Sequence, residues 1–464
     1  MRLGHRITGL CLALVTVGLG VPPAQAEDPP PTTLTMSGRA AYADESTWLE
    51  IDLVHSGDST PVAGAPVIVE RRTEGSWAQL GTVVTDESGH AELDATLART
   101  ARDNVFRASY AGDGLHAASE TGPIQVGLVR RNSRLQLTGP DSVVDEQQVT
   151  LAVRWRTGSG AAVAGSVRIF RRASDGPWTR DRTVRTGSDG RASFTSRPRT
   201  DIRWRAEVTG SDWLRGDTSG VHAVDNLPPG VPVRYPSTAP HPRVHVPRQP
   251  HAVGDGPNIS IARIPDPLWN RMTGITWHRG CPVGRAQLRH VRINYWDYQG
   301  YRRRGELVAN ADAAGRIAAA LAEMYDRGLP IRAMYLVDRF GYSSRVKGGD
   351  DFRSMAAGNT SVFNCREVVN KPGVRSPHAW GRALDLNTWE NPYRSARGIV
   401  PNTWWQPHSH RRIAWRSRSH AVVAIMARHG LRWTYGLGDT QHFDAMAGNG
   451  RYMARPLGCD GVCE

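Results

Sequence analysis

Short runs of alternating apolar and polar residues recur through the first half of the chain. Trp48–Leu53 and Val149–Arg154 are two of these runs. Strict alternation is typical of a β-strand that buries one face, because successive side chains point to opposite sides. Asp-Gly and Ser-Gly pairs separate the runs and predict hairpin turns between them. The first half of the chain is therefore expected to be all-β.

The strand-rich half contains two related units. Val62-Ala63-Gly64 in the first unit recurs as Val163-Ala164-Gly165 in the second, and Thr85–Ala91 recurs as Thr186–Ala192. Such self-similarity is the mark of a repeat architecture. We place the units at residues 31–128 and 132–225. They resemble bacterial immunoglobulin-like repeats, which implies a β-sandwich for each, and nothing in them looks catalytic.

The apolar spacing becomes helical in the second half of the chain. Between residues 305 and 327 apolar residues recur at helical intervals with alanines between them. This predicts an amphipathic helix over Gly305–Arg327, ended by Gly328. Ile331–Val337 is predicted as a strand and Val422–Arg428 as a second helix. Helices packed on a small sheet give an α+β domain, which we place at residues 259–464.

A proline-rich segment, residues 226–258, separates the repeats from the α+β domain. Proline fixes φ and lacks an N–H donor, so the segment is predicted to be an extended, semi-stiff linker. It contains His241, His245 and His251. These are expected to be solvated linker residues, and loose metal binding is the alternative.

The first 26 residues have the pattern of a secretory signal peptide. Arg2 and Arg6 are followed by an apolar core over Ile7–Leu19 and by the small-residue site Ala24-Gln25-Ala26. The apolar core is shorter than the roughly 20 residues of a membrane span, and no later segment is apolar enough to cross a bilayer. We expect an exported protein with no transmembrane segment after cleavage. A tethered form with the signal uncleaved is the alternative.

Four cysteines follow the predicted signal: Cys281, Cys365, Cys459 and Cys463. An even number in an exported protein favours disulfides, and four cysteines allow three connectivities. Cys459 and Cys463 are close enough for a short terminal loop, which would leave Cys281 to pair with Cys365. A zinc ribbon is the weaker alternative, because the spacings do not fit one.

The chain is strongly basic, with a formal charge of +14. Lys347 and Lys371 are its only lysines, so arginine supplies nearly all of the positive charge. A cationic exported protein is held near anionic polymers, and a solvated basic surface is the alternative. No aromatic-interleaved motif accompanies the charge, so we expect no nucleic-acid partner.

Two separated segments near the C-terminus carry the candidate chemistry. They contain His378, Asp385, His442 and Asp439. A catalytic zinc ion takes three protein ligands from His and Asp or Glu and leaves one position open for water. A nearby carboxylate that is not a ligand can take the proton of that water. His378, Asp385 and His442 would be the ligands, and Asp439 the base. Asp439 and His442 are three residues apart, which suits a helical turn or a tight loop.

The spacing of the first two candidate ligands requires a turn. His378 and Asp385 are seven residues apart, which would put them on opposite faces of a single strand. Gly381 lies between them and predicts a turn that returns both side chains to one cavity. Ala383–Leu386 is predicted as a short buried strand. The carboxylate of Asp385 would be costly there unless it is paired or bound to a metal.

Four sequence blocks in order resemble a known family. They are Phe363–Arg366, the pattern Ser376-x-His378-x-x-Gly381-x-Ala383-x-Asp385-x-Asn387, then Asn391-Pro392-Tyr393, and Asp439-x-x-His442-Phe443. The blocks resemble VanY-type D-alanyl-D-alanine carboxypeptidases and the related L-alanyl-D-glutamate endopeptidases of phage lysins. The similarity runs from about Ile259 onward. It implies a zinc peptidase that acts on the short stem peptides of bacterial peptidoglycan.

The resemblance also implies a role for each site residue. His378, Asp385 and His442 match the metal ligands, and Asp439 matches the general base. Many family members have Glu at the base position, and Asp matches the endopeptidase-like branch better. The family also uses an arginine upstream of the first ligand to hold the substrate.

Arg366 is our choice for that arginine, with Arg339 and Arg345 as alternatives and Ser376 as a further substrate contact. The family's Gly-Trp-x-Trp-Gly-Gly stretch is reduced here to Gly430–Gly436. The peptide bond that is cut, a terminal D-alanine or a bond within the stem, therefore stays open.

We expect two all-β immunoglobulin-like sandwiches followed by an α+β zinc peptidase domain. The protein would be a secreted or cell-wall-associated monomer that binds Zn²⁺ and cleaves stem peptides. Its repeats would act as spacers or weak wall-binding modules, with anionic wall polymers as possible partners. The alternative is a non-catalytic wall-binding or adhesion protein with a peptidase-like domain. The presence of all three ligands and the base favours the enzyme.

Overall fold

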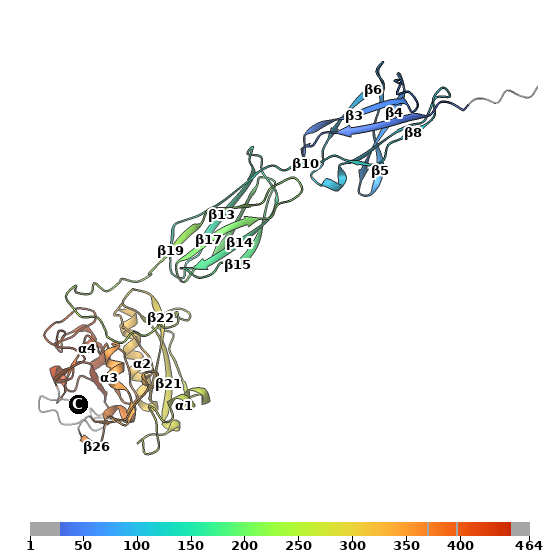
Figure 1. Ribbon diagram of the computed structural model, residues 1–464. Coiled ribbons are helices and arrows are strands. Elements are labelled where there is room, and N and C mark those ends of the chain that lie inside the picture. The colour runs from blue at the N-terminus through green and yellow to red at the C-terminus, as the bar shows by residue number, and fades with distance from the viewer. Residues whose placement is uncertain (1–27, 369–370, 396–397, 447–464) are drawn as a thin grey trace, which may run out of the picture.

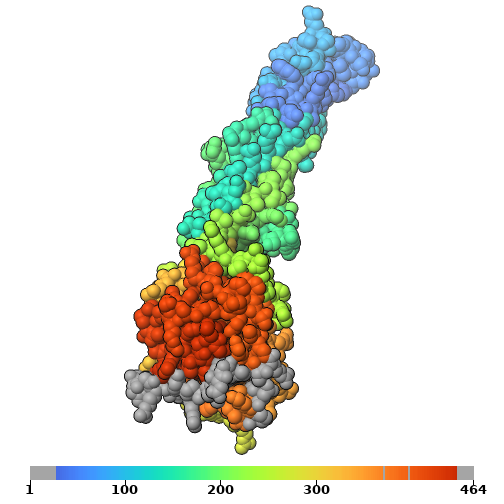
Figure 2. Space-filling view, turned by 90° about the vertical axis from the view of Figure 1, so that its left-hand side faces the viewer, coloured from blue at the N-terminus to red at the C-terminus, as the bar shows by residue number. Residues whose placement is uncertain are grey.

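The protein consists of three bodies in a row, two strand-rich and one mixed (Figure 1). A computed structural model describes residues 28–368, 371–395 and 398–446. The space-filling view shows an elongated arm that ends on the mixed C-terminal body (Figure 2). The predicted signal peptide and the Cys459–Cys463 pair lie outside the described residues. Among the helices of the described part, none is long and apolar enough to span a bilayer.

The first body is a two-sheet sandwich with the predicted alternation. One sheet has the order β1-β3-β6 and the other β5-β4-β7-β8, with β9 on β7, while β2 pairs with β10. The bounds are β1 Thr32–Gly38, β2 Ala41–Tyr42, β3 Ser46–His55, β4 Pro66–Thr73, β5 Ser76–Val84, β6 His90–Thr96, η1 Ala101–Asp103, β7 Val105–Tyr110, β8 Ser119–Glu120, β9 Ile124–Gln125 and β10 Leu128–Val129. Leu49, Ile51 and Leu53 of β3 form one core with Val67 of β4 and Phe106 of β7.

The second body repeats this plan. Its sheets have the orders β11-β13-β16 and β12-β19-β17-β14-β15, with β18 on β17. The bounds are β11 Ser133–Thr138, β12 Ser142–Val144, β13 Val149–Thr157, β14 Gly165–Ala173, β15 Thr179–Thr186, β16 Arg191–Ser196, β17 Ile202–Val208, β18 Asp217–Thr218 and β19 His222–Leu227. The recurring motifs take equivalent places, because Leu53 N–H donates to Gly89 O and Trp155 N–H donates to Gly190 O. The internal repeat inferred from sequence is therefore a structural repeat.

The C-terminal body packs helices on a small antiparallel sheet. Its long strands are β21 and β22, joined by β20 in the order β20-β21-β22, and α2 covers β21. The first elements are β20 Ser260–Arg263, α1 Asp266–Met272, η2 Arg285–Gln287, β21 Leu288–Trp296, β22 Arg302–Asn310, α2 Ala311–Asp326, η3 Val337–Phe340, β23 Tyr342–Ser343, β24 Gly348–Gly349 and α3 Asp351–Ala356. Ile317, Leu321 and Met324 of α2 are buried in one core with Val291 and Ile293 of β21.

The remaining elements carry the candidate site residues. They are β25 Glu367–Val368, β26 Lys371–Arg375, η4 Pro377–Trp380, β27 Ala383–Asp385, β28 Tyr393–Ser395, β29 Gly398–Val400, α4 Ala421–Arg428, β30 Leu431–Arg432, η5 Gly436–Gly438 and β31 His442–Ala445. β27, β31 and β30 form one sheet in the order β27-β31-β30. The short strand predicted at Ala383–Leu386 and the helix predicted at Val422–Arg428 are present as β27 and α4.

The helix predicted over Gly305–Arg327 begins later than expected. Residues up to Asn310 belong to β22, and the side chain of Asn310 caps α2 by accepting the N–H of Asp312. Leu307 and Val308 are buried within the sheet. Their apolar side chains are compatible with a buried strand as well as with the predicted helix. The prediction was wrong for this stretch because a short apolar run fits a buried strand as well as a helix.

The strand predicted at Ile331–Val337 is not formed. Asparagine and glutamine side chains accept hydrogen bonds from backbone N–H groups that would otherwise pair with a neighbouring strand. Met334 N–H donates to Gln249 Oε1 at 2.8 Å, and Tyr335 N–H donates to Asn359 Oδ1 at 2.7 Å. Val337 then begins the 3-10 turn η3. The segment is buried because side chains satisfy its backbone, which a local sequence pattern does not reveal.

The proline-rich segment is extended, but it is not a free linker. Residues 228–257, here called the strap, pack along the C-terminal body. The Gln249 amide donates to Met334 O at 2.7 Å, and Trp389 donates to Pro240 O at 2.6 Å. His241 and His245 are exposed, as expected, whereas His251 is half-buried beside Arg303. The linker prediction is corrected, because the strap completes the hydrogen bonding of the body.

Candidate metal centre

A tight turn presents the first candidate ligand. His378 lies in η4, where the Ser376 side chain caps the turn by accepting the His378 N–H. Gly381 ends the turn at φ +68, and a Cβ there would lie 2.8 Å from Asn310 N. Both the left-handed conformation and the close approach favour glycine. The turn predicted at Gly381 is confirmed, and Ser376 is buried as a cap of this turn.

Two neighbouring strands present the other two candidate ligands. Asp385 of β27 lies directly opposite His442 of β31 in the antiparallel register. Side chains in such positions share one face of the sheet. Phe443 points to the other face and is fully buried in the main core. The core therefore fixes the register that brings Asp385 and His442 together.

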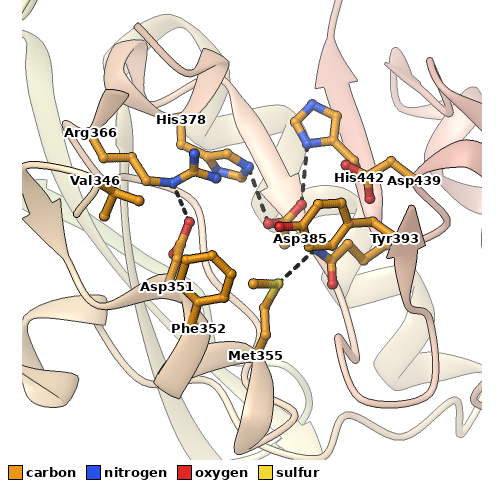
Figure 3. Close-up of a pocket in the computed structure, with 11 residues that line it drawn as sticks. Val346, Asp351, Phe352, Met355, Arg366, His378, Asp385, Tyr393, Asp439 and His442 are labelled. Atoms are coloured by element: carbon orange, nitrogen blue, oxygen red, sulfur yellow. Dashed lines mark hydrogen bonds and ion pairs between the residues drawn. The ribbon is translucent and has the colours of Figure 1, made fainter. Parts of the chain in front are cut away.

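The three side chains converge on one point (Figure 3). Nε2 of His378 lies 3.2 Å from Oδ2 of Asp385, and Nδ1 of His442 lies 3.2 Å from Oδ1 of Asp385. One ligand atom from each residue falls within 4.8 Å of the others, and all three residues are buried. The residues singled out from their types and spacing are thus brought together.

The outward-facing nitrogens of both imidazoles are also engaged. Nδ1 of His378 lies 2.7 Å from the carbonyl oxygen of Val362, and Nε2 of His442 lies 3.0 Å from Oδ1 of Asp444. Thr434 donates to the other oxygen of Asp444 at 2.6 Å. Partners of this kind fix the ring orientation and tautomer of a metal-binding histidine.

Asp444 was missed in the sequence analysis. Its signal was available, because His442 and Asp444 are two residues apart on a strand and so face the same side.

The charges of the site depend strongly on one another. Burial alone would lower the pKa of His378, but the Asp385 carboxylate outweighs it and raises that pKa. Burial likewise opposes the charged form of His442, but Asp444 and Asp385 hold its pKa well above its usual value. The pKa of Asp385 is held far below its usual range by the two imidazoles, against the effect of burial. The site thus favours a bound positive charge, either protons on the imidazoles or a cation in their place.

These residues fit a divalent metal ion such as zinc. Imidazole nitrogen and carboxylate oxygen are its ordinary protein ligands, and three of them leave one position open. Asp385 Oδ1 is buried and lies 3.2 Å from Nδ1 of His442, but it accepts no hydrogen bond of normal geometry within the described residues. A buried carboxylate oxygen in this situation calls for an additional partner, which a cation would supply.

Asp439 lines the same cavity as the three candidate ligands. It follows η5 in a loop before β31, so the tight-loop alternative is the one observed. Its backbone bridges to Tyr393, and only 5% of the residue is exposed. The cavity has a volume of about 10 Å³, which is close to the space of one water molecule.

Of the candidate arginines, Arg366 is the one that lines the cavity. Its Nε donates to the carboxylate of Asp351, and Asn364 donates to the other oxygen of Asp351 at 3.2 Å. Arg345 is exposed and lies over the ring of Phe352, which lines the cavity. Arg339 is exposed over Tyr335 and is not brought to the site.

A disulfide joins Cys281 to Cys365, the residue before Arg366. The expected pairing of these two cysteines is therefore confirmed. His278 lies beside the disulfide, and its Nε2 is 3.0 Å from Cys365 O. The two sulfurs are bonded to each other, so this group does not offer thiolate ligands to a metal.

Comparison with known families supports a peptidase at this site. Residues 369–445 match the model of a family described as D-alanyl-D-alanine carboxypeptidase. This part of the C-terminal body is therefore similar to a peptidase family. All three candidate ligands and Asp439 fall inside the matched residues, and Arg366 lies just before them. No curated protein matches the chain significantly.

Three solved structures resemble the chain at low identity. The first is a tetra-tandem repeat in the extending region of a large adhesion protein, at 12% identity and TM-score 0.25, covering 60% of this chain and 64% of that one. The second is native E. coli alpha-2-macroglobulin, at 11% identity and TM-score 0.19, covering 61% and 20%. The third is the D0-D1 domain of intimin, at 16% identity and TM-score 0.17, covering 42% and 98%. The chain thus spans less than two thirds of the adhesion-protein structure.

Proposed function

We propose that the protein is an exported, zinc-dependent peptidase that hydrolyses the stem peptides of peptidoglycan. One observation carries this proposal. His378, Asp385 and His442 converge within 4.8 Å in a buried cavity that Asp439 also lines. The family match to these residues supports a peptidase, and the donor set supports zinc.

Each site residue would have a separate role in peptide hydrolysis. A zinc ion held by His378, Asp385 and His442 would supply Lewis acidity and lower the pKa of a water molecule to about 7. The Asp439 carboxylate would accept one proton from the attacking water and deliver it to the leaving nitrogen as the C–N bond breaks. Arg366 would steady the substrate's carbonyl oxygen or a terminal carboxylate.

Neighbouring groups position these residues. The Val362 carbonyl and the Asp444 carboxylate each engage the outer nitrogen of one imidazole. They would keep Nε2 of His378 and Nδ1 of His442 facing inward with their lone pairs toward the cation. Asp351 holds the guanidinium of Arg366 at the cavity wall.

The test is digestion of purified peptidoglycan and defined stem peptides, followed by mass spectrometry of the products. The protein would be compared after chelation and after reconstitution with zinc. We expect chelator-sensitive cleavage. Release of D-alanine would establish a carboxypeptidase, and internal fragments would establish an endopeptidase. Absence of cleavage by zinc-loaded protein would contradict the proposal and favour a binding module.

The role of Asp439 has its own test. Asp439→Asn should keep bound zinc, measured by metal analysis of the purified protein, while turnover falls by about 100-fold or more. Asp255→Asn, at an exposed position of the strap, is the matched control and should keep both. An Asp439→Asn variant with normal turnover would show that another group takes the proton.

A further inference from the structure

One outer face of the second sandwich carries four arginines and no acidic side chain. The face belongs to the sheet β11-β13-β16, whose inward residues Leu135, Leu151 and Val153 are buried in the core. Its outward positions alternate with these. They are Arg134, Gln136, Thr138, Thr150, Ala152, Arg154, Arg156, Arg191, Ser193 and Thr195. We call this surface the arginine face.

The register sets these arginines against one another. Arg134 lies directly opposite Arg156, and Arg154 lies directly opposite Arg191. Like charges in directly opposite positions destabilise a sheet. The pKa of Arg154 is lowered, mainly by Arg156 and further by burial and Arg191. The arrangement therefore works against folding stability.

The arginine face lacks internal neutralisation. Within the described residues none of its four arginines forms an ion pair, and Nε of Arg154 and of Arg156 is covered and has no hydrogen-bond partner. Several arginines elsewhere on the same sandwich are paired. Arg171 lies 3.2 Å from Asp181, and Arg199 lies 2.9 Å from Asp145.

The fold does not require arginine at these positions. In the first sandwich the equivalent cross-strand pair is Asp52 opposite His90, with Nδ1 of the histidine 2.8 Å from the carboxylate. Residues 31–128 contain six arginines and fourteen acidic residues, a formal charge of −8. Residues 132–225 contain fifteen arginines and eleven acidic residues, a formal charge of +4. The two sandwiches share one architecture and have opposite charge.

The shape of the arginine face suits a chain-like ligand. It is hollowed into a shallow depression of about 520 Å³, lined by Gln136, Ala152, Arg154, Arg191 and Ser193 among others. The small side chains leave room for a polymer backbone between the guanidinium groups. None of its outward residues is aromatic, so it offers no platform on which nucleobases would stack.

We propose that the arginine face binds a linear polyanion of phosphodiester groups joined by small polyols. A guanidinium group can form bidentate hydrogen bonds with two phosphate oxygens, whereas a lysine ammonium group cannot. Arg154 and Arg156 are two residues apart on one strand, which spaces their attachment points by about 7 Å. A polymer with one charge per repeat would meet several arginines at once and relieve their mutual repulsion. This binding function goes beyond the proposed peptidase and does not rest on it.

The test measures binding of the full chain to poly(glycerol phosphate) at several salt concentrations. Each phosphate contact contributes about −0.7 to the slope of log affinity against log salt for a flexible strand, so four contacts predict a slope of about −3. The double variant Arg154→Gln/Arg191→Gln should bind at least tenfold more weakly, with a slope reduced in magnitude by about 1.4. The double variant Arg180→Gln/Arg185→Gln removes the same charge from exposed positions of β15 in the other sheet. It should bind within about twofold of the unmodified protein, because its arginines lie outside the face.

Thermal unfolding separates binding from folding. Removing like-charged neighbours should leave the melting temperature of the first double variant unchanged or raise it. Equal weakening in both double variants would overturn the proposal, because binding would then follow net charge alone. Preference for a single-stranded oligonucleotide of equal charge would also overturn it. So would concentration-dependent dimerisation lost in the same variant, since the acidic first sandwich of a second copy would then occupy the face.

Discussion

The arm and the C-terminal body use charged residues in opposite ways. In the two sandwiches the cores are apolar and nearly all charges lie on outward positions. In the C-terminal body His378, Asp385, His442, Asp444 and Glu390 are all buried. Buried charges are costly unless they are paired, whereas exposed charges change at little cost. The body therefore holds a fixed chemical arrangement, whereas the two sandwiches present surfaces whose charge can differ between two copies of one fold.

The largest effect should come from removing a buried ligand. His442→Ala should abolish zinc retention and lower turnover by at least about 1,000-fold, which corresponds to about 4 kcal/mol of transition-state stabilisation. Peptide cleavage and metal content would be measured on the same sample. His222→Ala, in the second sandwich, is the matched change in the arm and should leave both unchanged. Equal losses of zinc and turnover in the two variants would contradict a specific role for His442.

A buried ion pair of the body should matter more for stability than an exposed one. Arg332 donates to Glu390 with Nε at 2.9 Å, and Tyr298 donates to the other oxygen of Glu390 at 3.0 Å. Glu390→Ala would leave the guanidinium uncompensated and should lower the free energy of unfolding by about 3–5 kcal/mol. Asp312→Ala breaks the more exposed contact with Arg382 and should cost less than about 1 kcal/mol. Denaturant unfolding measures the free energy of unfolding of both variants. Similar losses in the two variants would contradict the prediction that the buried pair matters more.

Replacing Asp444 should weaken metal binding by the C-terminal body. Asp444→Asn keeps the shape of the side chain but removes the charge that engages Nε2 of His442. Loss of such a partner weakens metal binding by about 10- to 100-fold. Competition with a zinc-binding dye measures the Kd, and Asp312→Asn serves as the surface control. An unchanged zinc Kd would assign Asp444 a packing role only.

The smallest expected effect is a pH dependence at a partly exposed group of three charged residues between α2 and the end of α4. Arg428 and His429 lower the pKa of Glu323 from 4.5 to about 2. Because the folded pKa lies below the unfolded one, the stabilisation is present above pH 4.5 and is lost as the pH falls toward 2. Glu323→Gln should therefore destabilise by less than about 1 kcal/mol at pH 6, and the difference should vanish at low pH. A difference that is independent of pH would show that the charge is not its cause.

The sandwiches followed from sequence because their alternation is local. Each inward residue of β3 or β13 is followed by an outward one, so a period of two identifies the strand and its buried face. The candidate ligands followed from residue type and spacing, because a buried strand that contains Asp385 requires a partner for the carboxylate. The strands needed only neighbouring residues, whereas the candidate ligands also needed the combination of two separated segments.

The predictions that were wrong have a different cause, which is contact between segments far apart in the sequence. The N–H groups of Met334 and Tyr335 donate to the side chains of Gln249 and Asn359, so the expected strand is reduced to a single bridge at Ala333. The strap looked like a linker because its prolines lack donors, yet the Gln249 amide makes it part of the body. Leu307 fitted a helix and a strand equally well until the pairing of β22 with β21 decided between them.

The disulfide links the segment that carries the cavity's arginine to the redox state of its surroundings. Cys365 directly precedes Arg366, and its bond to Cys281 closes a loop of 84 residues that contains β21, β22 and α2. Disulfides persist in oxidising compartments and are rare where thiols are kept reduced. The segment that carries Arg366 therefore gains its covalent anchor only in an oxidising environment. Besides the ion pair with Asp351, the anchoring of Arg366 therefore depends on the redox state of its surroundings.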